Sequence, residues 1–395
     1  MNRDYQICSR CVLDTWDTSI EFDENGVCNY CHRAERALRE RTVSGEAGLR
    51  MFERQVEEVK QHGEGKEYDS ILGISGGTDS SYLAVKVVEA GLRPLAVHFD
   101  SGWNSEGAVH NIERLVKGLG IDLFTLVCDW REMKDLQRSY FRASVINCDV
   151  PQDHAFVAVL WKLAADNGIK HIFSGHNVAT ESYLPVSFRG YSSRDWKNIK
   201  AIQKRFGTRK LKAFPHVTYR RSQYYKYVKK FRVFNSLNYL DYDKSKATAE
   251  LRDRFQLVQY KGKHGESYFT KFFQGHYLPT KFGIDKRRAH LASLINSAQM
   301  TREEALEELS RPFYDNPSEL RQDKEFVLKK LGICEAEWVE IMGAPEVDAT
   351  AYPSNNRLYL TEQWGMARAA KIAKLVLPGS FTKKLQRKLR EKFSH

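Results

Sequence analysis

The feature that most constrains the fold is a loop of small residues between an apolar strand and a helix. The strand is expected to end at Ile74, the loop reads Ser75-Gly-Gly-Thr-Asp79-Ser80, and a helix should follow over 79–90. Glycines let the main chain close around an anion, while loop N–H groups and the helix dipole attract negative charge. The loop lacks the Walker A lysine but has an acid, Asp79, at the start of the helix. This pattern predicts a phosphate-binding loop in which Asp79 holds Mg²⁺, with a plain turn capped by Asp79 as the alternative.

Strands and helices alternate after this loop. Further strands are expected over 93–99, 122–128 and 171–173, and further helices over 107–118 and 153–167. Such alternation predicts an α/β fold with a doubly wound parallel sheet, whose ligands bind at the carboxyl ends of the strands. Polar loops follow three of the strands, over 75–80, 100–104 and 174–181. We therefore expect these three loops to meet at one site.

Four of the seven cysteines lie near the start of the chain, as Cys8-x2-Cys11 and Cys28-x2-Cys31. Two residues between thiolates allow both sulfurs of a pair to bind one ion, and two pairs complete a tetrahedron. Disulfides are the alternative, but a reducing compartment disfavours them. Because cysteine fills all four positions, the predicted Zn²⁺ is structural rather than catalytic.

The net charge of +12 is concentrated in one segment. Residues 189–232 contain 15 Lys or Arg and one acid, Asp195, which leaves 47 bases against 49 acids elsewhere. The segment is also rich in aromatic residues, a combination that can bind phosphates and stack bases. A solvated helical face with inward-packed aromatics is the alternative. We expect this segment to cover the site and to receive an anionic substrate or an acidic partner, with nucleic acid less favoured.

The hydropathy of the chain and its first residues indicate the cellular compartment of the protein. No apolar run approaches the ~18 residues of a spanning helix, and the first residues lack the apolar core of a secretion signal. We expect a cytoplasmic protein without a transmembrane segment.

The loop at Ser75–Ser80 resembles the pyrophosphate loop, SGG-x-DS, of the ATP pyrophosphatases, or PP-loop enzymes, which include GMP synthetase, asparagine synthetase and tRNA-thiolating enzymes. Residues 174–177 are similar to the second nucleotide loop of that group. More narrowly, the chain up to about Pro312 resembles the N-acetyl sugar amidotransferases of bacterial surface-polysaccharide synthesis. The strings that carry this resemblance are 196–202, 275–288 and 299–306.

The resemblance implies four parts in the chain. They are a zinc-binding module (1–45), an ATP-pyrophosphatase α/β domain (46–188), a basic aromatic-rich region for substrate or partner (189–312) and a largely helical C-terminal region (313–395). The implied reaction, in lipopolysaccharide O-antigen synthesis, converts an acetamido group of a nucleotide-linked diacetamido sugar to an acetamidino group. ATP first adenylates the amide oxygen, and ammonia then displaces AMP.

The resemblance also suggests roles for individual residues. The residues expected to bind ATP are Ser75, Gly76, Gly77, Thr78, Ser80, Asp100, Gly175 and His176, with Asp79 as the Mg²⁺ ligand. Candidates for contacting the phosphates of ATP or of the sugar nucleotide are Lys281, Lys286, Arg287 and Arg288, with a solvated surface as the alternative. His154 and Glu181 are candidate proton carriers, although such residues are often only capping or hydrogen-bonded groups.

The chain lacks the sequence motifs of a glutaminase. Position 2 is not cysteine, and no cysteine lies in a G-x-C-x-G turn. We therefore expect a separate glutaminase subunit, and the resemblance points to a glutaminase and a barrel protein similar to the two histidine-biosynthesis subunits. A tRNA-thiolating enzyme is the main alternative, weakened because no Cys-x2-Cys pair is expected near the ATP loop. A non-catalytic zinc-ribbon RNA-binding protein ranks last, because it leaves the loop unexplained.

Overall fold

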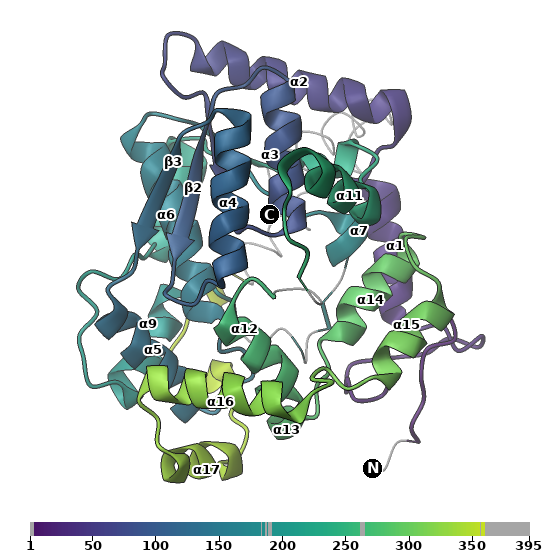
Figure 1. Ribbon diagram of the computed structural model, residues 1–395, viewed down its shortest axis with the longest axis vertical. Helices are drawn as coiled ribbons and strands as arrows, with labels where there is room; N and C mark the ends of the chain where they lie inside the picture. Colours follow the sequence, from purple (N-terminus) through teal and green to yellow (C-terminus); the bar gives the residue numbers. More distant parts are fainter. Residues whose placement is uncertain are drawn as a thin grey trace.

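A parallel sheet of five strands forms the centre of the molecule (Figure 1). The computed structural model describes residues 4–182, 184–185, 188, 192–260, 265–355 and 357–359. The strands lie in the order β3-β2-β1-β4-β5 and all neighbours are parallel. Their bounds are Ser70–Gly73 (β1), Pro94–Asp100 (β2), Leu123–Val127 (β3), His171–Phe173 (β4) and Arg232–Phe234 (β5). The chain runs outward from β1 in both directions, which confirms the doubly wound sheet and places its switch point between β1 and β4.

Helices cover both faces of the sheet. Adjacent residues of β1 show the division, because Ile71 packs into one hydrophobic core and Leu72 into the other. The helices on the Leu72 side are α2 (Gly45–Gly63), α3 (Thr78–Glu89), α4 (Glu106–Leu119) and α11 (Lys244–Phe255). Those on the Ile71 side include α5 (Trp130–Arg142), α6 (Val150–Asp166) and α9 (Trp196–Phe206). Each helix predicted from the sequence is present within a few residues of its expected bounds.

Several elements of this core were not predicted, among them α5, α9, α11 and β5. Helix α5 lies between β3 and α6, in a stretch for which the sequence analysis proposed no element. Strand β5 extends the sheet from within 189–312, the range expected to form a separate region. The sheet thus draws on both of those parts of the chain, and the proposed division into four parts remains a proposal.

The rest of the described chain is mainly helical, as expected for the C-terminal region. The remaining elements before the C-terminal helices are α1 (Asn29–Arg41), α7 (Val178–Glu181), α10 (Tyr219–Gln223), the π-helical turn η1 (Tyr224–Val228) and the 3₁₀ turn η2 (Ser236–Tyr239). The later elements are α12 (Tyr268–Phe272), η3 (Phe273–Tyr277), α13 (Leu278–Phe282), α14 (Arg287–Asn296), α15 (Arg302–Ser310), α16 (Pro317–Leu331), α17 (Glu335–Gly343) and η4 (Ala349–Ala351). No helix in these ranges is both long and apolar enough to cross a membrane.

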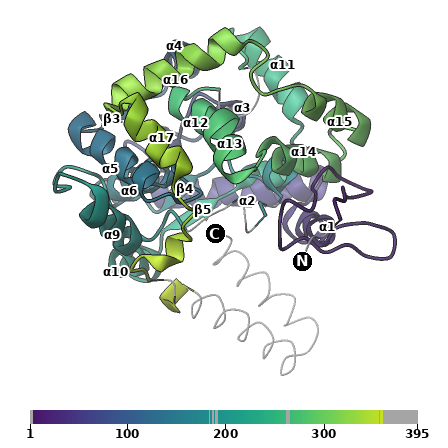
Figure 2. The same ribbon diagram turned by 90° about the horizontal axis from the view of Figure 1, so that it is seen from below.

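The N-terminal module and the basic segment lie on different sides of the molecule. Figure 2 shows α1 beside α14, whereas α9 and α10 lie across the sheet from them. Helix α1 packs against α7 and α14, and α9 packs against α5 and α6. The two regions that the sequence analysis singled out therefore have different surroundings.

Candidate active site

The two predicted nucleotide loops face each other at the switch point of the sheet. The Ser75–Ser80 loop follows β1, and the Ser174–Asn177 loop follows the neighbouring strand β4. A Cβ atom on Gly175 would lie 2.9 Å from the backbone nitrogen of Ser80, so only glycine permits this close approach. Gly76 has a φ of +82°, and a Cβ there would lie 3.0 Å from the carbonyl oxygen of Ala108. Gly76 and Gly175, one in each loop, are thus required by the local geometry.

Hydroxyl groups inside the first loop hold its shape. The Oγ atoms of Ser75 and Ser80 are 3.2 Å apart, and the backbone N–H of Gly77 donates to Ser75 Oγ over 3.3 Å. Helix α3 begins at Thr78, so the positive end of its dipole faces the loop. Loop hydroxyls and the helix N-terminus together suit a phosphate group.

A large cleft with a volume of about 1650 Å³ opens at these loops. It brings together most of the residues predicted to act on ATP or substrate: Ser75, Gly77, Thr78, Asp79, Ser80, Gly175, His176, Glu181, Lys286 and Arg287. The remaining candidates, which do not line it, are Gly76, Asp100, His154, Lys281 and Arg288. Gly76 still shapes the phosphate loop from behind. The structure therefore places four of the predicted residues away from the cleft: Asp100, His154, Lys281 and Arg288.

Asp79 is positioned by two hydroxyl groups that the sequence analysis missed. Its carboxylate accepts a hydrogen bond from Thr180 Oγ1 at 3.2 Å and another from the hydroxyl of Tyr242. Burial and the negative charge of Asp79 raise the pKa of Tyr242, which keeps that hydroxyl a neutral donor. Oxygen atoms of this kind are the ligands that Mg²⁺ prefers, so the carboxylate of Asp79 fits the predicted metal role.

A histidine–carboxylate pair lies along the cleft, and a further acid on α6 interacts with it without lining the cleft. His176 Nδ1 is hydrogen-bonded to Glu181, and both side chains are partly exposed. Asp153, in the first turn of α6, interacts electrostatically with Glu181 and Lys286. Its side chain reaches solvent, yet the surrounding protein and the negative charge of Asp149 raise its pKa to about 7. The sequence analysis selected the adjacent His154 and missed Asp153.

His154 is a structural residue and not a proton carrier at the cleft. Its Nδ1 hydrogen-bonds the carbonyl oxygen of Ser193 at 2.7 Å, and its Nε2 accepts the backbone N–H of Val217 at 3.1 Å. The ring is also stacked with Trp196, at a centroid distance of 5.6 Å. Burial lowers the pKa of His154 to about 4, so the ring is neutral with both nitrogens occupied. The predicted role in catalysis is therefore wrong.

This environment predicts a pH dependence of folding stability. The unfolded His154 has an ordinary pKa near 6.5, so the unfolded state binds more protons than the folded state between pH 6.5 and 4. Stability should therefore fall as the pH drops through this window, by up to about 3 kcal/mol from this residue. Urea unfolding at pH 7 and pH 5 should show a smaller difference for His154→Gln than for the wild type. Equal pH dependence in the two proteins would contradict the assignment.

Two of the four predicted cationic residues are used for packing. Lys281 Nζ donates to the carbonyl oxygens of Ile341 and Ala344, the latter over 2.8 Å, and so caps the end of α17. Arg288 forms an ion pair with the buried Asp14 at 3.2 Å and donates to a carbonyl oxygen of the N-terminal module. The predicted ligand roles of Lys281 and Arg288 are corrected accordingly.

The other two cations remain candidates. Arg287 lines the cleft, although its guanidinium is also held by Asp285 at 2.6 Å. Lys286 lines the cleft and has no hydrogen bond or ion pair within the described chain. Lys286 is therefore the better placed of the two to meet a ligand.

Asp100 and the basic segment also lie away from the cleft. Asp100 Oδ1 accepts the backbone N–H of Gly102 at 2.8 Å and the amide of Asn104 at 3.1 Å, so it stabilises its own loop. No residue in 192–232 lines the cleft. The described residues of this segment therefore do not cover the site, contrary to the expectation. The polar loop at 100–104 also does not join the loops at 75–80 and 174–181 in lining the cleft.

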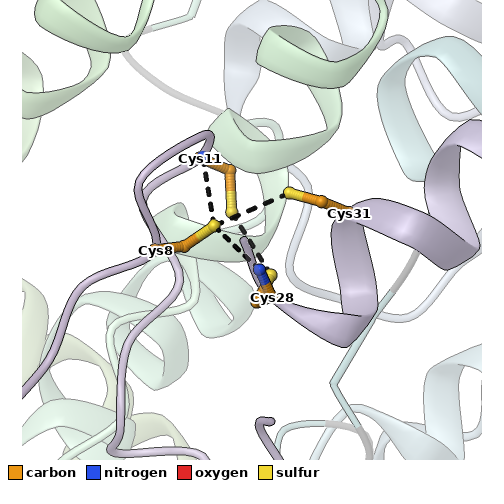
Figure 3. A group of neighbouring side chains, drawn as sticks. All are labelled: Cys8, Cys11, Cys28 and Cys31. Carbon is orange, nitrogen blue, oxygen red and sulfur yellow. Dashed lines mark hydrogen bonds between the residues drawn. The ribbon is translucent and has the colours of Figure 1, made fainter. Parts of the chain in front are cut away.

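The four N-terminal cysteines converge on one point (Figure 3). The sulfurs of Cys8 and Cys31 are 3.9 Å apart, and those of Cys11 and Cys28 are 3.8 Å apart. A tetrahedron with Zn–S bonds of about 2.3 Å has edges of about 3.8 Å, so this donor set fits Zn²⁺. Backbone N–H groups also point at the sulfurs, including that of Cys28 at 3.2 Å from Cys8 Sγ. All four side chains are buried.

The comparisons with known proteins find one family match, in the C-terminal part of the chain. Residues 266–371 match the family model described as LPS biosynthesis protein WbpG-like, C-terminal domain. No curated protein matches the chain. The match spans about a quarter of the chain, so it identifies a WbpG-like C-terminal domain and leaves the family of the whole chain as a proposal.

Some solved structures are similar in part. The NH3-dependent NAD synthetase from Campylobacter jejuni is 13% identical, with 40% of this chain and 72% of that chain covered and a TM-score of 0.28. The NMN synthetase from Francisella tularensis is 13% identical, with 54% and 98% covered and a TM-score of 0.23. The NAD+ synthetase from Burkholderia pseudomallei is 16% identical, with 58% and 100% covered and a TM-score of 0.26. These scores are too low to bear on function.

Proposed function

We propose that this PP-loop chain, with its WbpG-like C-terminal domain, is an ATP-dependent amidotransferase of lipopolysaccharide synthesis that converts the acetamido group of a nucleotide-linked diacetamido sugar to an acetamidino group. The observation that carries the proposal is the pairing of the Ser75–Ser80 and Ser174–Asn177 loops at the mouth of a cleft that the C-terminal region also lines. ATP and the sugar would share this cleft.

The reaction proceeds in two displacements. The amide oxygen of the acetamido group attacks the α-phosphorus of ATP, and the bond to the β-phosphate breaks, so that pyrophosphate leaves. Ammonia then attacks the carbon of the adenylated imidate, and AMP departs with the original amide oxygen. The nitrogen loses a proton, and the amidine remains on the sugar. Adenylation is required because an amide oxygen is by itself a poor leaving group.

The residues at the cleft suit these steps. The loop hydroxyls of Ser75 and Ser80 and the start of α3 are placed to hold the departing pyrophosphate. Asp79 would hold Mg²⁺, which would neutralise charge on the phosphates. Glu181, which lines the cleft and is hydrogen-bonded to His176, can accept the proton that the incoming nitrogen loses.

We also propose that a separate protein supplies the ammonia. This predicts that AMP formation by the chain depends on whether ammonium or glutamine is the nitrogen donor. The chain contains no recognised glutaminase nucleophile, and all seven cysteines are away from the cleft lining. We expect the purified chain to form AMP with a nucleotide-linked diacetamido sugar, ATP and ammonium, and to be inactive when glutamine replaces ammonium. Equal AMP formation with glutamine alone would refute a separate glutaminase. Adding a glutaminase and a barrel protein similar to the histidine-biosynthesis subunits should restore glutamine use.

The alternative of tRNA thiolation lacks support at the cleft. A sulfur carrier needs an accessible thiol near the adenylated base, but Cys128 and Cys148 are buried. Cys334 is exposed but does not line the cleft. Measuring AMP formation with the sugar nucleotide plus ammonium, against bulk tRNA plus sulfide, separates the two functions. A cytoplasmic location goes with the proposed function, since ATP and nucleotide sugars are cytoplasmic metabolites.

A further inference from the structure

The helix that follows the cysteine cluster forms part of the wall of the cleft. The residues of α1 that line it are Arg33, Arg36, Ala37, Glu40 and Arg41. Their spacing of three and four residues places them along one face of the helix. Arg39, on the same helix, does not line the cleft. The predicted structural module thus contributes three cations to the candidate active site.

The position of α1 is set from two directions. Cys28 is its N-cap residue and Cys31 lies in its first turn, so a bound Zn²⁺ would fix the start of the helix. From the C-terminal region, Arg302 donates to the carbonyl oxygens of Cys8 and Cys11 at 3.1 Å. Arg288 adds its ion pair with Asp14. Helix α1 is therefore held beside α7 and α14, which also line the cleft.

The cleft has room for a second ligand beside ATP. Its volume of about 1650 Å³ exceeds the range of roughly 300–1,000 Å³ for a site that holds one small molecule. The glycine loops occupy the end next to β1 and β4, and α1 lines the cleft on the side of α7 and α14. The two sets of phosphate-binding groups thus come from different walls.

Two of the three cleft-lining cations on α1 are available to a ligand. Arg36 and Arg41 are exposed and make no hydrogen bond or ion pair with a described residue. Lys286, at the N-cap of α14, likewise makes no hydrogen bond or ion pair with a described residue, and it lines the same cleft. A guanidinium presents planar pairs of donors that match phosphate oxygens. Glu40 is the acidic exception on this face of α1.

We propose that Arg36 and Arg41 form a second anion subsite, which binds the phosphate of the sugar nucleotide while ATP occupies the glycine loops. This inference rests on the proposed function for the identity of the second substrate. It gives the N-terminal module a direct role in substrate binding in addition to its structural role. Arg33 and Lys286 border the same subsite.

The test compares the double variant R36Q/R41Q with R39Q as a matched control on the same helix. The protein is first saturated with a non-hydrolysable ATP analogue, and calorimetry then measures binding of UDP and of CMP. We expect the wild type and R39Q to bind at least one of these nucleotides equally well. R36Q/R41Q should bind it about tenfold more weakly or worse, since each lost contact involves a charged hydrogen bond. Affinity for the ATP analogue should stay within about twofold of wild type, because the glycine loops are untouched.

Two results would overturn the subsite. One is that neither nucleotide binds when the ATP analogue is present, and the other is that all three proteins bind alike. These binding results do not depend on turnover. The proposed function fails separately, if wild-type protein forms no AMP with nucleotide-linked diacetamido sugars and ammonium.

Discussion

Asp79→Asn should reduce AMP formation by at least about a hundredfold, because it removes the one carboxylate charge at the start of α3. The substitution keeps the shape of the side chain, so the hydrogen bond from Thr180 Oγ1 can persist. What is lost is the negative charge that would hold Mg²⁺ against the phosphates of ATP. The measurement is the rate of AMP release with ammonium and the sugar nucleotide at saturating Mg²⁺.

Tyr242→Phe is the matched control for this experiment. It removes the hydroxyl donor to Asp79 while leaving the buried ring in the core. We expect a smaller loss of rate, because the carboxylate keeps its charge and its contact with Thr180. Unchanged melting temperatures would show that both variants fold. Full turnover by Asp79→Asn under these conditions would rule out the assigned metal role.

Local patterns sufficed to predict the sheet and its phosphate loop. The residues of 75–80 are neighbours in sequence, and both the strand before them and the helix after them have clear apolar periodicity. Strand β5 has only three residues and follows a run of cations, so periodicity could not reveal it. Its place in the sheet depends on pairing with β4, a long-range contact.

The neighbouring residues His154 and Asp153 show a second limit of prediction from the sequence. Consecutive residues of a helix point about 100° apart, so one of them can face the cleft while the other is buried. The partners of His154 are Ser193 and Val217, which lie far along the chain. Only the folded structure shows that these groups occupy both ring nitrogens. The residue type favoured the histidine, but its tertiary contacts leave neither ring nitrogen available for proton transfer.

The basic segment shows why a count of charged residues is a poor guide to the position of a binding site. Two buried acids of α5 fix the main chain of this segment: Glu132 accepts N–H groups of 212–214, and Asp135 accepts those of Thr208 and Arg209. Its aromatic residues Trp196 and Phe214 pack against His154. The segment is therefore anchored on α5 and α6, on the opposite side of the molecule from α1 (Figure 2). Lys286 and Arg287 came from a local basic run, but the cleft-lining arginines of α1 lie far from that run in the sequence.

Removing one cysteine of the N-terminal cluster should cost the chain its zinc and much of the stability of the N-terminal module. In Cys28→Ser the tetrahedral set has only three thiolates, and Cys28 is also the N-cap residue of α1. The cysteine module is too short to be stable on a hydrophobic core alone, so metal binding should supply a large part of its folding energy. We expect zinc well below one ion per chain and a melting temperature lower by more than about 5 °C.

Cys334→Ser is the matched control, since Cys334 is exposed and lies outside the cluster. It should retain one zinc ion per chain and the wild-type melting temperature. Because α1 carries Arg36 and Arg41 into the cleft, Cys28→Ser should also weaken UDP or CMP binding while affinity for the ATP analogue persists. A Cys28→Ser protein that keeps its zinc and its melting temperature would show that the four thiolates do not form a metal site. If it lost zinc but kept full nucleotide affinity, the module would be structural only, and the arginine face of α1 would be held by Arg288 and Arg302 without the metal.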